Sequence, residues 1–308
     1  MRNRKLSSMT YRETKLVGRD DAAPWTRYDY VSKNYRSSKV YTTHARCLAS
    51  LFEWHTETLN AWTMLVGALI ALCCLTYAFS KQFLQPSDQM VFIMFFLSVT
   101  LHTPLSVGYH VFMPISAVTD LYWRRLDTGG VLLVSVLLSF TLSYYVFPLN
   151  VVLALTSVSF LFFLFGLLEL RTWKPREPAP RGYLSTLISG GVVVYLSPMV
   201  WQTVVDIANA RLTVPLLSFG AFVSLGTGVT MFALAIPQRC YPDELSTIGT
   251  AHHYMHLTLI SANLCEFIFI LHMHGREVAN HASSPRLDSL FYLAFYCSTL
   301  PDISCRPM

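Results

Sequence analysis

Charged side chains are scarce in this 308-residue sequence. Asp, Glu, Lys and Arg together make up 13% of it, whereas hydrophobic residues make up 53%. Soluble domains contain about 25% charged residues, so the composition argues against a water-soluble enzyme. The mean hydropathy of +0.42 indicates that much of the apolar surface faces something other than water. The high apolar content also excludes a disordered chain.

The sequence also lacks a cleavable signal peptide and the cysteine pattern of a disulfide-linked or metal-binding domain. The first 30 residues contain no apolar core of a cleavable signal peptide, so we expect the first hydrophobic span to act as its own insertion signal. The seven cysteines lack C-x-x-C spacing and are interpreted as small buried hydrophobic residues. Cys297 and Cys305 alone could pair, in the C-terminal tail.

Long stretches without Asp, Glu, Lys or Arg define the fold class. A transmembrane helix needs about 20 mostly apolar residues. The stretch 128–168 is about twice that length, and Pro148-Leu149-Asn150 near its middle favours a turn there. Together these stretches predict an all-α membrane protein, a seven-transmembrane helix bundle. Its helices are expected at about 59–80, 90–112, 128–147, 151–170, 183–204, 214–236 and 250–273.

The distribution of Lys and Arg predicts the orientation. Eleven of the 23 precede residue 55, and alternate assignment of the loops puts 18 on the side of the N-terminus and five on the other. Because cytoplasmic loops retain these residues, the N-terminus is expected in the cytoplasm and the C-terminus on the exoplasmic side. The expected domains are a basic N-terminal segment (1–54), a membrane domain (55–275) and a short exoplasmic tail (276–308).

The basic N-terminal segment also contains Trp25, Tyr28, Tyr30 and Tyr35. It either packs against the membrane face or an anionic lipid surface, or it is a solvated tail.

Ionisable residues inside the spans are the functional candidates, because they are costly in lipid. Ser106 and His110 lie near the cytoplasmic end of the second predicted helix, and Asp127 at the start of the third. His252 and His256 lie at the start of the seventh helix. These residues are therefore expected at the same membrane depth. Further along the seventh helix, Glu266, His272 and His274 either line a polar path or, for the two histidines, lie at the interface.

The spacing of these residues suggests a metal site. His252 and His256 are four residues apart, so they share one face of a helix and can bind one ion, whereas His253 points elsewhere. His110 would complete three ligands, and three histidines with one water are a ligand set of catalytic zinc. Asp127 could act as a general base on that water or orient a ligand histidine. The alternatives are interfacial histidines without a metal, or haem ligation, which histidines on one helix face disfavour.

Five segments resemble the progestin and adipoQ receptor (PAQR) family. The segment 51–63 reads LFEWHTETLNAWT, with the HTET and N-x-W-T elements of the family signature. Ser106-x-x-x-His110, then Leu126-Asp127, follow the family pattern. So do Ala235-Ile236-Pro237-Gln238-Arg239-x-x-Pro242 and Ala251-His252-x-x-x-His256. Two departures, Ala251 for a common serine and Leu59 for a small residue, remove no ligand.

The resemblance implies a seven-helix fold with a cytoplasmic N-terminus and Zn²⁺ bound by His110, His252 and His256. It also implies that Asp127 contacts the zinc through water, with Ser106 nearby. Some members resemble ceramidases, so the leading interpretation is a signalling receptor that hydrolyses a lipid amide, with Asp127 and Ser106 as catalytic residues. The alternative is a non-catalytic hormone, steroid or lipid receptor in which zinc is structural. A transporter with a proton relay is a third and weaker interpretation, because no repeat is visible.

Partners and location follow from the same resemblance. The lipid bilayer is the first expected partner, followed by a sphingolipid such as ceramide or a steroid-like ligand, and an exoplasmic protein hormone is possible. No nucleic-acid partner is expected. The plasma membrane is the expected location, with the endoplasmic reticulum or the Golgi as alternatives.

Overall fold

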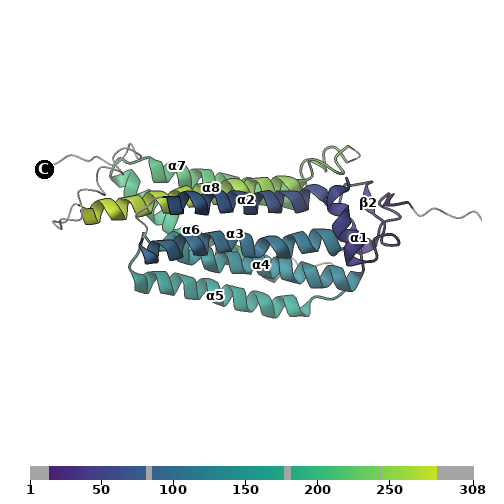
Figure 1. Ribbon diagram of the computed structural model, residues 1–308, viewed down its shortest axis with the longest axis horizontal. Coiled ribbons are helices and arrows are strands. Elements are labelled where there is room, and N and C mark those ends of the chain that lie inside the picture. Colours follow the sequence, from purple (N-terminus) through teal and green to yellow (C-terminus); the bar gives the residue numbers. More distant parts are fainter. Residues whose placement is uncertain (1–13, 81–84, 177–181, 243, 283–308) are drawn as a thin grey trace, which may run out of the picture.

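The computed structural model describes residues 14–80, 85–176, 182–242 and 244–282. Within these residues, seven helices are long and apolar enough to cross a membrane, as the sequence predicts. They are α2 (Thr58–Ser80), α3 (Pro86–Phe112), α4 (Ala117–Ser143), α5 (Leu149–Thr172), α6 (Gly182–Ala208), α7 (Thr213–Leu234) and α8 (Ala251–Ala282). The helices run alongside one another along the long axis of the molecule (Figure 1).

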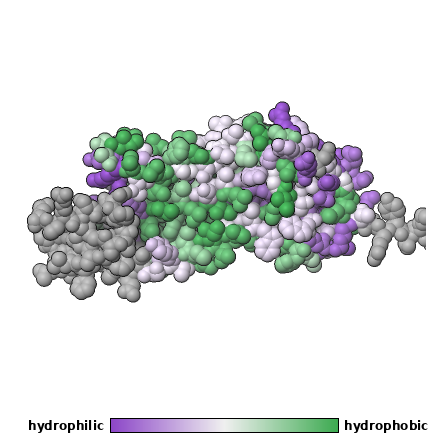
Figure 2. All heavy atoms as spheres, turned by 90° about the horizontal axis from the view of Figure 1, so that it is seen from above, coloured by the Kyte–Doolittle hydropathy of each residue, from purple (hydrophilic) through white to green (hydrophobic). Residues whose placement is uncertain are grey.

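The helices form a ring in which each packs against its neighbours in the sequence, and α8 closes the ring against α2. Helix α4 is the most deeply buried of the seven and packs against α3, α5, α6 and α8. Apolar side chains cover the middle of one face, and hydrophilic side chains gather towards the ends (Figure 2). This surface matches a hydrocarbon layer flanked by water.

Two predicted helix boundaries were wrong. Helix α4 begins at Ala117 rather than at 128, so Asp127 lies inside the helix and not at its start. The charged residues that suggested a loop find partners instead. Arg124 lies 3.7 Å from Asp120 one turn away, and Arg125 donates to the carbonyl oxygen of Arg171 at 3.1 Å. Helix α8 also continues beyond the expected end at 273 to Ala282.

The described part of the N-terminal segment is folded against one end of the bundle. It contains β1 (Leu16–Val17), η1 (Pro24–Thr26), β2 (Tyr35–Arg36), α1 (His44–Ala49) and η2 (Ser50–Phe52). The two strands pair antiparallel, and Ala22, Val31 and Tyr35 form a small core beside them. The expectation of a solvated tail is therefore wrong for this part, and packing against a lipid surface stays a prediction.

Hydrogen bonds from this segment satisfy the last carbonyl groups of α3, which a helix leaves without partners. Trp25 Nε1 donates to the carbonyl oxygen of Met113 at 3.0 Å. The buried Arg36 donates to the carbonyl oxygens of Val111, at 2.8 Å, and His110. The amide of Asn34 donates to the hydroxyls of Ser246 and Thr247, in the loop before α8, at 2.8 and 3.0 Å.

The far end of α8 is bound to the bundle as well. Arg276 forms a bidentate ion pair with the fully buried Asp206 of α6, with distances of 2.8 and 2.7 Å. His274 lies 3.3 Å from Asp88 at the start of α3. Both His272 and His274 are buried within the bundle, and their place at the membrane interface stays a prediction. Cys297 and Cys305 lie outside the described residues.

Candidate metal centre

Three histidines from two distant helices meet at the end of the bundle that the N-terminal segment covers. His110 lies in the last turn of α3, and His252 and His256 lie in the first turns of α8. Each histidine offers one ring nitrogen to the group, and these three nitrogens lie within 4.8 Å of one another. His110 is fully buried, His256 nearly so, and His252 is half-buried. The structure thus brings together the three residues that the sequence predicts as metal ligands.

The start of α8 fixes the direction of its two histidines. Gln238 Oε1 accepts a hydrogen bond from the backbone N–H of Ala251 at 2.7 Å, and His253 Nδ1 accepts from that of Thr250 at 3.0 Å. These bonds satisfy N–H groups at the helix start. The rings of His252 and His256 lie 4.7 Å apart, as expected for residues four apart in a helix. His253 therefore has a structural role and points away from the group, as predicted.

Two of the three rings are held from behind by oxygen atoms. His110 Nδ1 lies 2.8 Å from Glu57 Oε2, and His256 Nδ1 lies 2.8 Å from Thr63 Oγ1. Ligand histidines typically use their second nitrogen in this way, which fixes the ring and its tautomer. Neither Glu57 nor Thr63 was predicted from the sequence as part of the site. Both residues belong to the HTET and N-x-W-T elements of the sequence. These elements lie at the start of α2, beside the end of α3 and the start of α8.

The remaining nitrogens are suited to a metal ion. Among the described residues, His110 Nε2 and His252 Nδ1 are buried atoms with no hydrogen-bond partner. A buried imidazole nitrogen without a partner is energetically costly, and a bound cation would remove that cost. The donor set of three imidazoles fits zinc, with a fourth position left for water.

Glu57 is the centre of a hydrogen-bond network around His110. Its Oε2 also accepts from Asn60 Nδ2 at 3.0 Å and from the hydroxyl of Tyr28 at 3.1 Å. Burial by itself raises the pKa of Glu57, but the hydrogen bond and charge of His110, with Asn60 and Arg36, lower it below the usual range. The Glu57 carboxylate thus lies directly behind a ligand, where its negative charge would favour a cation at the centre.

Asp127 and Ser106 lie deeper in the bundle than His110. Because α3 and α4 are joined by a short turn, Asp127 on α4 is level with His102 on α3, two turns before His110. Asp127 Oδ1 lies 2.9 Å from His102 Nε2, and the carboxylate also interacts with Ser106, His110 and His256. The expectation of one common depth was therefore only approximate, and His102 was not predicted from the sequence.

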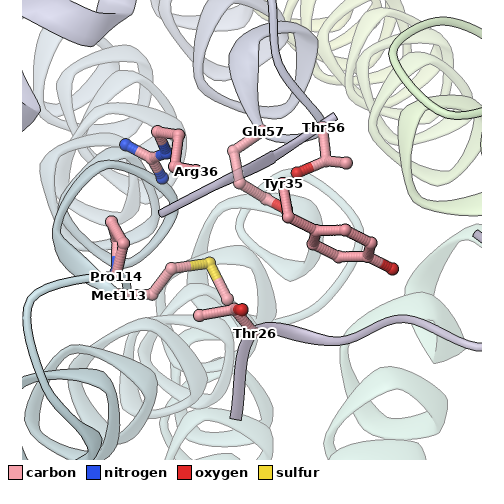
Figure 3. Close-up of a pocket in the computed structure, with 7 residues that line it drawn as sticks. All are labelled: Thr26, Tyr35, Arg36, Thr56, Glu57, Met113 and Pro114. Carbon is pink, nitrogen blue, oxygen red and sulfur yellow. The ribbon is translucent and has the colours of Figure 1, made fainter. Parts of the chain in front are cut away.

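A small cavity lies where the N-terminal segment packs against the end of the bundle that contains the metal centre. Its volume is about 10 Å³, close to what one water molecule requires. It is lined by Thr26, Tyr35, Arg36, Thr56, Glu57, Met113 and Pro114 (Figure 3). The N-terminal segment thus covers the polar end of the site, and Glu57 connects this cavity with His110.

Comparison with known proteins gives consistent similarities. The model of the haemolysin-III-related family matches residues 52–267, which contain the three histidines of the centre, together with Glu57, Thr63, His102, Ser106 and Asp127. The sequence is 28% identical over 246 residues to an uncharacterized protein of Schizosaccharomyces pombe, covering 77% of this chain and 54% of the relative. It is 25% identical over 239 residues to the adiponectin receptor protein of Drosophila melanogaster, covering 74% and 52%.

A shorter match reaches 32% identity over 98 residues of the ADIPOR-like receptor IZH3 of Saccharomyces cerevisiae, covering 29% of this chain and 18% of the relative. The chain spans about half the length of the first two relatives.

Proposed function

The chain belongs to the haemolysin-III-related family, and from this premise we propose that it is a membrane receptor whose three-histidine centre binds zinc and hydrolyses a lipid amide. The observation that carries the proposal is the convergence of His110, His252 and His256 in one buried group, with Asp127 and Ser106 deeper in the bundle. Two relatives are named as receptors related to the adiponectin receptor, which supports the signalling part.

A zinc ion held by three histidines supplies a Lewis acid and lowers the pKa of a bound water to about 7. The chain's own residues would do the rest. Glu57 and Thr63 hold the rings of His110 and His256 in place. The Asp127 carboxylate accepts a proton from the attacking water, and the Ser106 hydroxyl donates a hydrogen bond to a developing oxyanion.

The bilayer is the proposed route of the substrate. The N-terminal segment covers the end of the bundle near the site, through bonds from Trp25 and Arg36 to the end of α3. A substrate with an acyl chain, such as a ceramide, would instead enter between helices from the lipid. The proposed location of the protein is the plasma membrane, with an exoplasmic ligand controlling the receptor.

Elemental analysis of the purified protein is the first test. We expect about one zinc per chain in the wild type and none in His256→Ala. The zinc-loaded wild type should release fatty acid from ceramide in detergent micelles, and a chelator should abolish this release. Absence of zinc from folded wild-type protein would overturn both the metal and the hydrolase proposals.

A second candidate function is a receptor in which zinc is structural. The observation that favours it is that the ligands and their partners come from α2, α3 and α8, so that a bound ion would hold three helices together. Asp127→Ala separates the two functions. A hydrolase loses turnover while keeping its zinc, whereas a structural site shows no turnover in either protein and a Tm that falls on chelation.

A further inference from the structure

A second imidazole–carboxylate pair lies beside the three-histidine centre. His102, Ser106 and His110 follow one another at intervals of four residues on α3, so they lie in one row along the helix. His102 lies furthest along α3 from the end of the bundle that the N-terminal segment covers. Its side chain is 9% exposed. Nothing in the proposed zinc site requires a histidine at this position, because the three ligands are already supplied by His110, His252 and His256.

The ring of His102 is held in one place by α4. Its Nε2 lies 2.9 Å from Asp127 Oδ1. Gly130, three residues after Asp127, leaves the room for the ring: a Cβ atom at Gly130 would lie 2.6 Å from His102 Cδ2. An ionised carboxylate only accepts hydrogen bonds, so His102 Nε2 carries the proton of this bond.

From this position Asp127 is near enough to the metal centre to interact with its ligands. The carboxylate interacts with Ser106, one turn from His102, and electrostatically with His110 and His256. With His102 bonded to Oδ1, the carboxylate cannot turn freely about its last side-chain bonds. Without this bond, Asp127 would be a poorly solvated acid free to rotate away from the centre.

We propose that His102 is a positioning residue that holds Asp127 towards the three-histidine centre, and thereby sets the efficiency of the proposed hydrolysis. This inference rests on the proposed function for its effect on catalysis. Its structural part, the orientation of Asp127 beside the metal, does not depend on turnover. Partners of this kind typically account for 10- to 100-fold in activity or metal affinity.

The test compares three variants of the full-length protein. His102→Leu removes the donor at similar volume, and His102→Gln keeps an N–H near the position of Nε2. Ser98→Ala is the matched control, since Ser98 is buried one turn earlier on α3 and donates only to the carbonyl oxygen of Phe95 in its own helix.

We expect His102→Leu to lower kcat for ceramide hydrolysis 10- to 100-fold with little change in KM, and His102→Gln to recover most of it. Adding His102→Leu to Asp127→Asn should cause no further loss, because His102 acts through Asp127. The Ser98→Ala protein should match the wild type.

The second readout is independent of turnover. In protein loaded with Co²⁺ in place of zinc, His102→Leu should shift the visible absorption bands of the metal, and His102→Gln and Ser98→Ala should leave them near those of the wild type. If the wild type is inactive but the bands follow this pattern, the proposed hydrolase function fails and the positioning of Asp127 stands.

Two results would overturn the inference. In the first, the His102→Leu protein shows the same Co²⁺ absorption bands and the same kcat as the Ser98→Ala protein. In the second, both His102 variants lose thermal stability and bound metal to the same extent, which would make His102 a packing residue.

Discussion

At the residue scale, the centre depends on how each ring nitrogen is used. His110 and His256 both use Nδ1 to bond an oxygen from the start of α2, which leaves Nε2 directed elsewhere. His252 has no such bond in the described part of the chain, and it packs against the edge of Phe232 instead. The three ligands are therefore not equivalent, and the strength with which each is held should differ.

Glu57→Ala should weaken zinc binding about 10- to 100-fold, because His110 loses the carboxylate that fixes its tautomer and orientation. The measurement is competition for zinc with a chelator of known affinity, on purified protein. Glu53→Ala is the control: Glu53 belongs to the same signature segment but bonds Lys15 and Tyr41, not a histidine. Equal zinc affinities in the two variants would contradict the role given to Glu57.

His55 should make the protein sensitive to acid. Its Nε2 bonds the carbonyl oxygen of Ser50 and its Nδ1 accepts the backbone N–H of Glu57, both at 3.0 Å, so a second proton has no place. Burial, and then the charge of Arg36, lowers the pKa of His55 to about 3.

Because the unfolded chain binds this proton near pH 6.5 and the folded one does not, stability is lost as the pH falls from 6.5 towards 3. The loss should reach about 2 kcal/mol by pH 5. Thermal unfolding between pH 7 and 5 checks this: the Tm of wild type should fall more steeply than that of His55→Gln. Parallel curves would show that other groups cause the acid sensitivity.

At the scale of elements, the contact of α3 with α4 determines the position of His102, Ser106 and His110, which lie in one row on α3. Gly108 lies two residues before His110 and against the ring of Trp123, so that a Cβ atom there would lie 2.1 Å from the ring. The residue pairs of this contact, Gly108 with Trp123 and His102 with Asp127, also set the depth of the carboxylate. A small change in the distance between the helices would therefore move both.

Gly108→Ala should destabilise the protein by about 1–3 kcal/mol, because the methyl group forces α3 away from α4. It should also lower the zinc content, since His110 moves with α3. Thermal unfolding and elemental analysis measure the two effects. Gly226→Ala on α7 is the matched control, because a Cβ atom there meets nothing within 4 Å. A Gly108→Ala protein as stable as this control would contradict the predicted clash.

The extension of α8 depends on one buried ion pair. Arg276→Met leaves the fully buried Asp206 without its partner and should destabilise the protein by about 3–5 kcal/mol. Adding Asp206→Asn should restore part of that loss, because the uncompensated charge is removed. The Tm values of the single and double variants test this, with the exposed Arg211→Met as control. A double variant less stable than Arg276→Met would argue against a buried charge as the cause.

At the scale of the whole molecule, the protein is an integral multi-pass membrane protein, and the resemblance to the PAQR family is confirmed by the family match. The N-terminal segment and the end of α8 lie at opposite ends of the bundle, as an odd number of spans requires (Figure 1). Which end faces the cytoplasm stays a prediction from the distribution of Lys and Arg.

An epitope tag at the N-terminus should be inaccessible to antibody in intact cells and accessible after permeabilisation, and a tag at the C-terminus should be accessible in both. The reason is that 18 of the 23 Lys and Arg residues lie on the side of the N-terminus. Labelling of the N-terminal tag in intact cells would reverse the predicted orientation. It would also put the metal centre near the exoplasmic face.

The features that depend on local chemistry could be predicted from the sequence alone. Stretches without charge mark the spans because a charge in hydrocarbon is costly wherever it lies. Pro148 divides the longest stretch between α4 and α5. The spacing of His252 and His256 puts both on one face, because the α-helix has a fixed period.

How these parts meet could not be predicted in this way, because it depends on the packing of the helices. Glu57 behind His110, Thr63 behind His256 and His102 against Asp127 are pairs between helices, and their distances depend on which faces pack and at what depth. The early start of α4 had the same origin, because Arg125 finds its acceptors near the end of α5 and not in α4. Partners on another helix leave no periodicity in the sequence, so the ligands were predictable and the residues that hold them were not.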